Sequence, residues 1–163
     1  MKRGQFELSF GFIFSVILIA VFIVVAVIAI NAFLDIRCSA ETGKFIQDLK
    51  VEVNRIWTGA GYEGEKEFNI NGCGIEFVCF YSESLRERGE YSDFIEDFKA
   101  YTGEEGEHNL YFYPRDSVDI PSTFINHVNM SSFSKNPYCF ENKDNKIKIN
   151  FEKRVNEAIV RIS

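Results

Sequence analysis

Cysteine is the residue type in this 163-residue chain whose chemistry is most readily specified. The sequence has four: Cys38, Cys73, Cys79 and Cys139. Their number is even and all of them follow a long apolar segment, a pattern that favours disulfides if the residues after that segment lie outside the cell. No Cys-x-x-Cys pair occurs, and the two histidines, His108 and His127, stand alone in the sequence. We therefore expect no zinc site and no other metal centre.

Sequence spacing limits how the four cysteines can pair. Residues 74–81 are predicted to form a strand, which would hold Cys73 and Cys79 about 20 Å apart, too far for a disulfide. Cys38 is therefore expected to pair with Cys73 or with Cys79, and Cys139 to take the other. The alternative is four buried, reduced thiols, because cysteine is among the most frequently buried residues.

A run of acidic residues is the second candidate for chemistry. Residues 83–107 contain nine Asp and Glu against three Lys and Arg. Glu104, Glu105 and Glu107 could supply oxygen ligands to calcium, but the Asp-x-Asp-x-Asp-Gly pattern of a calcium-binding loop is absent. We interpret the run as the solvated face of a surface helix.

The sequence contains none of the motifs that mark common catalytic sites. It lacks a Gly-x-Ser-x-Gly turn, a phosphate-binding loop, a dinucleotide fingerprint and a His-Glu-x-x-His helix. His127 is predicted to lie on the face of a strand and His108 in a polar turn, which leaves little scope for a catalytic triad. We predict a protein that is not an enzyme and needs no cofactor. A membrane-tethered enzyme is the least favoured hypothesis.

Two further candidates lie in the second half of the chain. Asn129-Met130-Ser131 matches the acceptor pattern for N-glycosylation and falls in a predicted turn. The aromatic run of residues 110–114, together with Tyr81 and Tyr101, could offer a contact surface to another protein. We favour the simpler interpretation that these aromatic side chains fill the core of a small domain.

The N-terminal part has the composition of a segment that spans a membrane. Residues 8–34 carry no charge and would form a helix of about 40 Å, against a hydrocarbon core of about 30 Å. The run is about twice as long as a signal-peptide core and lacks an Ala-x-Ala site, so a retained anchor is favoured over a cleaved secretory signal. Lys2 and Arg3 precede it, which predicts a cytoplasmic N-terminus in the cell membrane and an extracellular location for residues 35–163.

Residues 35–163 form an acidic body, with 16 Lys and Arg against 23 Asp and Glu and hence a net charge of −7. Such a surface repels phosphates, so we expect no nucleic-acid partner. Apolar residues at helical spacing predict an amphipathic helix over residues 42–57, capped by Ser39 or Thr42. This helix could be continuous with the membrane helix, with a weak point near residues 38–43.

The predicted fold class is α+β: a long N-terminal transmembrane helix, then the amphipathic helix packed on a small antiparallel sheet. Turns at Asn71-Gly72 and at residues 142–145 are expected to close hairpins of an antiparallel meander. A second helix is predicted over residues 84–101. Seven segments are predicted to be strands: residues 67–70, 75–81, 109–113, 123–128, 138–141, 147–152 and 158–162.

The N-terminal residues Lys2-Arg3-Gly4-Gln5-Phe6-Glu7-Leu8-Ser9-Phe10 resemble the class III signal of archaeal type IV pilins and related pilin-like proteins. The resemblance implies that a membrane peptidase cuts between Gly4 and Gln5. Residues 1–4 would then be a leader, residues 5–34 the mature transmembrane helix, and residues 35–163 an extracytoplasmic α+β domain.

The resemblance also implies a contact between subunits. Glu7 would form a salt bridge with the new N-terminus of a neighbouring copy, although the family usually carries this acid two residues later, where this chain has Ser9. Gly11 and Ser15 are small and one helical turn apart, so copies of the helix could pack closely there. The rest of the chain resembles short archaeal membrane-anchored proteins of unknown function, which implies no activity.

Two hypotheses follow for function. The first is a non-catalytic, pilin-like surface protein that acts in filament assembly, adhesion or cell-surface interaction. Its partners would be membrane lipid, further copies of the chain through the N-terminal helix, and other envelope or surface proteins. The second is a permanent single-span membrane protein whose outer body binds or scaffolds an envelope partner.

Overall fold

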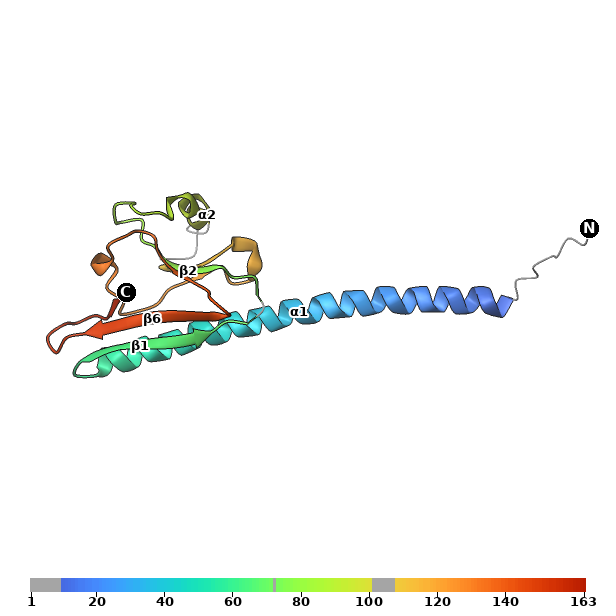
Figure 1. The fold of residues 1–163 in the computed structure, drawn as a ribbon, viewed down its shortest axis with the longest axis horizontal. Coiled ribbons are helices and arrows are strands. Elements are labelled where there is room, and N and C mark those ends of the chain that lie inside the picture. Colours follow the sequence, from blue (N-terminus) through green and yellow to red (C-terminus); the bar gives the residue numbers. More distant parts are fainter. Residues whose placement is uncertain (1–9, 72, 101–107) are drawn as a thin grey trace, which may run out of the picture. The chain divides into compact units, whose positions relative to one another are not determined.

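A computed structural model describes residues 10–71, 73–100 and 108–163 of the chain. A long helix, α1 (Phe10–Thr58), is followed by antiparallel sheets and short helical turns, so the expected α+β fold is confirmed (Figure 1). The contacts divide the chain into two compact units that meet between Arg37 and Cys38. The second unit, Cys38–Ser163, is called the head below.

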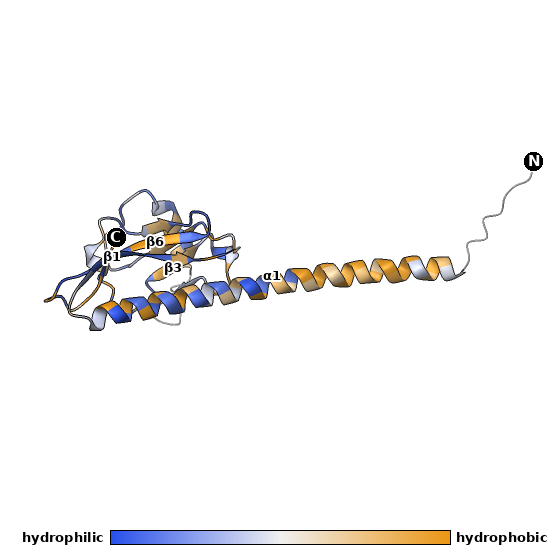
Figure 2. Cartoon of the chain, turned by 60° about the horizontal axis from the view of Figure 1, so that its bottom comes forward, coloured by the Kyte–Doolittle hydropathy of each residue, from blue (hydrophilic) through white to orange (hydrophobic). Residues whose placement is uncertain are grey.

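The N-terminal part of α1 is apolar on every side. Every residue from 11 to 37 is exposed, and residues 11–34, here called the apolar segment, carry no charged side chain. Figure 2 colours the apolar segment almost uniformly hydrophobic, whereas hydrophilic and hydrophobic residues alternate in the rest of the helix. Among the described residues, α1 is the one helix long and apolar enough to cross a membrane.

From Thr42 onward the same helix is amphipathic, as the spacing of residues 42–57 predicts. Its buried face is formed by five apolar side chains: Phe45, Ile46, Leu49, Val53 and Ile56. The helix runs through residues 38–43 without a break, so neither Ser39 nor Thr42 acts as a cap. Thr42 instead lies in the core, where its hydroxyl has no hydrogen-bond partner.

The strands form two antiparallel sheets rather than the single meander expected from the sequence. The first sheet has the order β1-β6-β7 and the second the order β4-β3-β2-β5. The strands are β1 (Tyr62–Asn69), β2 (Phe77–Phe80), β3 (Leu110–Tyr113), β4 (Ser122–Thr123), β5 (Tyr138–Glu141), β6 (Lys146–Lys153) and β7 (Arg161–Ile162). Short helices are η1 (Ser92–Phe94), α2 (Ile95–Lys99), η2 (Arg115–Ser117) and η3 (Met130–Ser132).

The two predicted hairpins are wrong because each turn joins strands of different sheets. β1 pairs with β6 and not with β2, and Gly72 of the first turn lies outside the described residues. The second turn is present: Asp144 and Asn145 have φ of 55° and 61°, and Lys143 and Lys146 exchange backbone hydrogen bonds of 3.0 and 2.9 Å. It leads, however, from β5 in the second sheet to β6 in the first.

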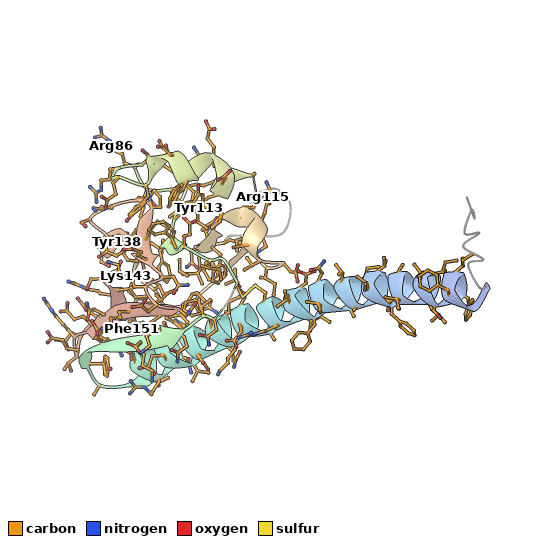
Figure 3. The ribbon with its side chains drawn as sticks, turned by 45° about the vertical axis from the view of Figure 1, so that its right-hand side comes forward. Arg86, Tyr113, Arg115, Tyr138, Lys143 and Phe151 are labelled. Carbon is orange, nitrogen blue, oxygen red and sulfur yellow. A yellow bond between two sulfur atoms is a disulfide. The ribbon has the colours of Figure 1, made fainter. Side chains whose placement is uncertain are left out.

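The main core lies between α1 and both sheets. The Phe45 ring of α1 is 5.5 Å from the Phe68 ring of β1 and 5.8 Å from the Phe112 ring of β3. Phe151 of β6 belongs to the same core (Figure 3). Burial of apolar surface from one helix and two sheets in a single cluster is the main source of stability for a domain of this size.

The second sheet is buried on its other face as well. Cys79 and Tyr111 of this face form a smaller cluster with Ile95 and Phe98 of α2. This explains why β2 reads as a continuous apolar run instead of alternating. The helix predicted over residues 84–101 is limited to the short η1 and α2, and its Tyr101 lies outside the described residues.

The strand predicted over residues 123–128 is limited to β4, Ser122–Thr123. Beyond β4, the Asn109 side chain makes the hydrogen bonds that the backbone of a neighbouring strand would otherwise make. The Asn109 side-chain amide donates to the backbone oxygen of Ile125 at 2.9 Å, and the Ile125 backbone N–H donates to Asn109 Oδ1 at 2.8 Å. His127 follows with a φ of 65°, so it does not lie on a strand face as predicted.

Candidate functional site

The apolar segment is the first candidate site, because it exposes the largest apolar surface of the described chain. Gly11 and Ser15, predicted as a subunit contact, are both exposed and lie one turn apart. The Ser15 hydroxyl donates to the Gly11 carbonyl oxygen at 2.8 Å. This hydroxyl is therefore satisfied inside the helix and can enter an apolar environment without an unpaired donor. Gly4, Gln5 and Glu7 lie outside the described residues.

The cysteines form two disulfides, Cys38–Cys73 and Cys79–Cys139. This is one of the two pairings that the sequence leaves open, and no described cysteine is a free thiol. Cys79 and Cys139 are direct partners in the pairing of β2 with β5. Cys38 lies on α1 at the first residue of the head, and a disulfide is visible beside the helix in Figure 3.

The head also holds the C-terminal end of α1. The buried Lys153 side chain of β6 donates to the carbonyl oxygens of Trp57 and Gly59, the latter at 2.7 Å. A cation at this position satisfies carbonyl groups that have no partner within the helix and interacts favourably with the helix dipole. The Trp57 indole N–H donates to the Ala158 carbonyl oxygen at 2.9 Å. The head therefore fixes α1 at both Cys38 and Trp57.

Oppositely charged side chains lie together between α1 and β1. Hydrogen bonds from the Arg55 guanidinium hold the pKa of the Glu52 carboxyl below its ordinary value, although burial acts in the opposite direction. The Lys66 ammonium lies 3.9 Å from the same carboxylate, and the Arg55 guanidinium lies 4.9 Å from the centre of the Tyr62 ring. A small cleft of about 270 Å³ beside Glu52 is therefore explained as part of the packing between α1 and β1.

The structure brings both histidines of the chain to one hollow in the head. This hollow has a volume of about 810 Å³. His108 Nδ1 lies 2.7 Å from the Ser122 hydroxyl oxygen, and the His127 ring stacks on the Trp57 indole with their centres 3.7 Å apart. The lining residues are Ser82, Glu83, Ser84, His108, Asn109, Phe124, Ile125, His127, Val128 and Met130.

Two buried asparagines fix two separate segments of this lining. Asn109 pairs with both backbone groups of Ile125, as described above. Asn136 does the same for Ser82: its Nδ2 donates to the Ser82 carbonyl at 2.9 Å, and the Ser82 backbone N–H donates to its Oδ1 at 3.1 Å. No sequence signal could have revealed the hollow, because these pairs join residues 16 and 54 positions apart.

The remaining predicted sites have different outcomes. Glu104, Glu105 and Glu107 lie outside the described residues, and the described residues contain no group of three side chains that could hold a metal ion. Residues 110–113 of the aromatic run form β3, in which Leu110, Tyr111 and Phe112 are buried and Tyr113 is half-buried. Tyr81 is also buried, so most of these side chains pack in the core as favoured. Asn129 of the glycosylation pattern is half-buried and directly precedes η3.

Comparisons of the chain with models of protein families, with curated proteins and with solved structures find no match.

Proposed function

We propose that this chain is a pilin-like surface protein, in which the apolar segment anchors the chain in the membrane and packs against other copies. The observation that carries the proposal is the continuity of α1. One uninterrupted helix is apolar and exposed over residues 11–34 and is built into the head from Thr42 onward. At about 1.5 Å per residue the apolar segment is roughly 36 Å long, enough to cross a hydrocarbon core of about 30 Å.

Two local features support packing between copies. The Gly11 position lacks a side chain and lets a neighbouring backbone approach, and Ser15 has its hydroxyl paired within its own helix. The head part of α1 is fixed at both of its ends, at Cys38 and at Trp57. This supports a role in which the helix anchors the head and does not rotate within it.

The orientation proposed for the chain follows from charge and redox chemistry. Lys2 and Arg3 precede the apolar segment, which favours a cytoplasmic N-terminus. Disulfides persist in oxidising surroundings, and both disulfides lie in the head. An added protease should therefore digest the head on sealed cells while the N-terminus stays protected.

Processing is tested by the intact mass of the protein purified from native membranes. We expect the mass to show loss of residues 1–4, and Gly4→Leu to prevent that loss. Retention of residues 2–4 in every molecule would favour the alternative, a permanent single-span protein whose head binds an envelope partner.

Assembly is tested through Glu7. In a dry helix bundle the Glu7 carboxylate would pair with the amine of a neighbouring copy, and breaking such a buried pair typically costs about 3 to 5 kcal/mol. Glu7→Gln should leave membrane insertion and head folding intact and abolish recovery of high-mass assemblies from sheared cells. Glu63→Gln, which changes an exposed acid of β1, is the matched control and should assemble normally.

The helix contact is tested separately at Gly11. Gly11→Leu adds a side chain where copies are proposed to approach, and should reduce the yield of assemblies without affecting insertion. Ile13→Leu lies on the opposite side of the helix and should have no effect. Equal assembly by Glu7→Gln, Gly11→Leu and the unaltered chain contradicts the proposal.

A further inference from the structure

The hollow that contains both histidines lies where several segments of the second sheet end. Its lining residues belong to three segments of the chain: one that follows β2, one that precedes β3 and one that follows β4. Because Asn109 and Asn136 hold the backbone of Ile125 and Ser82, these segments are kept in place without a ligand. A pre-formed hollow of this kind is typical of small-molecule binding sites, which usually measure about 300 to 1,000 Å³.

His127 occupies a backbone conformation that costs free energy. Its φ of 65° lies in the left-handed region, which a residue with a side chain seldom adopts. One face of its ring is covered by Trp57, and His127 is also one of the residues that line the hollow. Residues with a strained backbone of this kind are concentrated at binding sites, where the strained conformation holds the side chain in the position that binding requires.

The lining combines hydrogen-bonding side chains with apolar side chains. The hydroxyl oxygens of Ser82 and Ser84 lie 2.8 Å apart, and the His108 ring is oriented by Ser122. Apolar surface comes from Phe124, which is 39% exposed, and from its neighbours Val128 and Met130. Such a lining can contact a ligand that has both hydroxyl groups and an apolar face.

The composition of the lining argues against an anion and against a metal ion. None of the described lining residues is Lys or Arg, and the carboxylate of Glu83 would repel an anion. A metal ion is not favoured either, because the described residues offer no group of three metal-ligating side chains. We therefore propose that the hollow binds a neutral saccharide, with the C–H face of a pyranose ring on Phe124 and its hydroxyls toward the serines and His108.

The proposal goes beyond the pilin-like function and does not depend on it, because it concerns the head alone. It is tested with the full chain in a phosphocholine detergent, which contains no sugar. The probes are maltose, cellobiose, lactose and mannobiose, each examined by saturation-transfer NMR. We expect transfer to the ring protons of at least one disaccharide. Absence of transfer to all four overturns the proposal, as does transfer only to an apolar peptide tested in parallel.

Variants locate the binding site. Phe124→Ser and His127→Asn should each weaken binding at least tenfold, and asparagine at position 127 tolerates the left-handed backbone. Val155→Ser, which alters a side chain that is 77% exposed and outside the lining, should bind like the unaltered chain. Thermal unfolding followed by circular dichroism identifies variants that fail to fold. Unchanged binding by both folded lining variants overturns the assignment to this hollow.

Discussion

Tyr111 places a phenol group between the second sheet and α2, where water is excluded. Burial raises its pKa to about 12, and the carboxylate of Glu83 acts in the same direction. The pKa of the buried Tyr81 hydroxyl is also raised, first by burial and then by Glu87. The folded head therefore keeps protons on these hydroxyls at a pH where the unfolded chain releases them.

We predict that the free energy of unfolding falls as pH rises from about 10 to about 12. The unfolded state binds fewer protons than the folded state in this window, so the slope with pH is negative. Two pKa units correspond to roughly 3 kcal/mol for Tyr111 alone. Urea unfolding at several pH values measures the slope. Tyr111→Phe should reduce the slope, and a slope that Tyr111→Phe leaves unchanged contradicts the prediction.

Single residues also show where sequence reasoning succeeds and where it ends. The buried face of residues 42–57 could be predicted because helical periodicity is local. The position of His127 could not, because its left-handed backbone and its stacking on Trp57 depend on contacts between residues 70 positions apart. The same applies to Asn109, whose side chain takes the place of a strand.

Among the elements, α1 has the most specific anchoring in the head. Lys153→Met removes two charged hydrogen bonds, one to the Trp57 carbonyl in the last turn of α1 and one to the Gly59 carbonyl just beyond its end. We expect the free energy of unfolding to fall by about 2 kcal/mol. Urea unfolding followed by circular dichroism measures the loss. Lys148→Met, at an exposed β6 residue 3.8 Å from Glu65, should change stability by less than about 0.5 kcal/mol.

The locations of the strands could be predicted better than their partners. Alternation in residues 147–152 identifies β6 because one face is buried and the other is exposed. One partner of β6 is β1, more than 75 positions away, and no local pattern specifies that choice. β2 is buried on both faces, between α1 and α2, and its continuous apolar run is typical of such a strand. The run does not specify which elements cover the two faces.

At the scale of the whole molecule, the disulfides should account for much of the stability of the head. Cys38–Cys73 joins residues 35 positions apart, and closing such a loop lowers the entropy of the unfolded chain by an amount worth roughly 4 kcal/mol. We predict that replacing both cysteines by serine lowers the free energy of unfolding by about that amount. Guanidinium unfolding of the two proteins tests this, and a difference below about 1 kcal/mol contradicts it.

The positions of the two disulfides also determine how the head responds to tension. If the chain is pulled at Cys38 and at Ser163, the covalent links bypass the residues between Cys38 and Cys73 and between Cys79 and Cys139. About 125 peptide units separate these two residues, and about 30 of them lie outside the bypassed loops and can extend. Their extended length is roughly 100 Å, compared with more than 400 Å for the reduced chain. An oxidised head under load therefore stays short, and the strands of the second sheet joined by Cys79–Cys139 remain tied together even when their hydrogen bonds have broken.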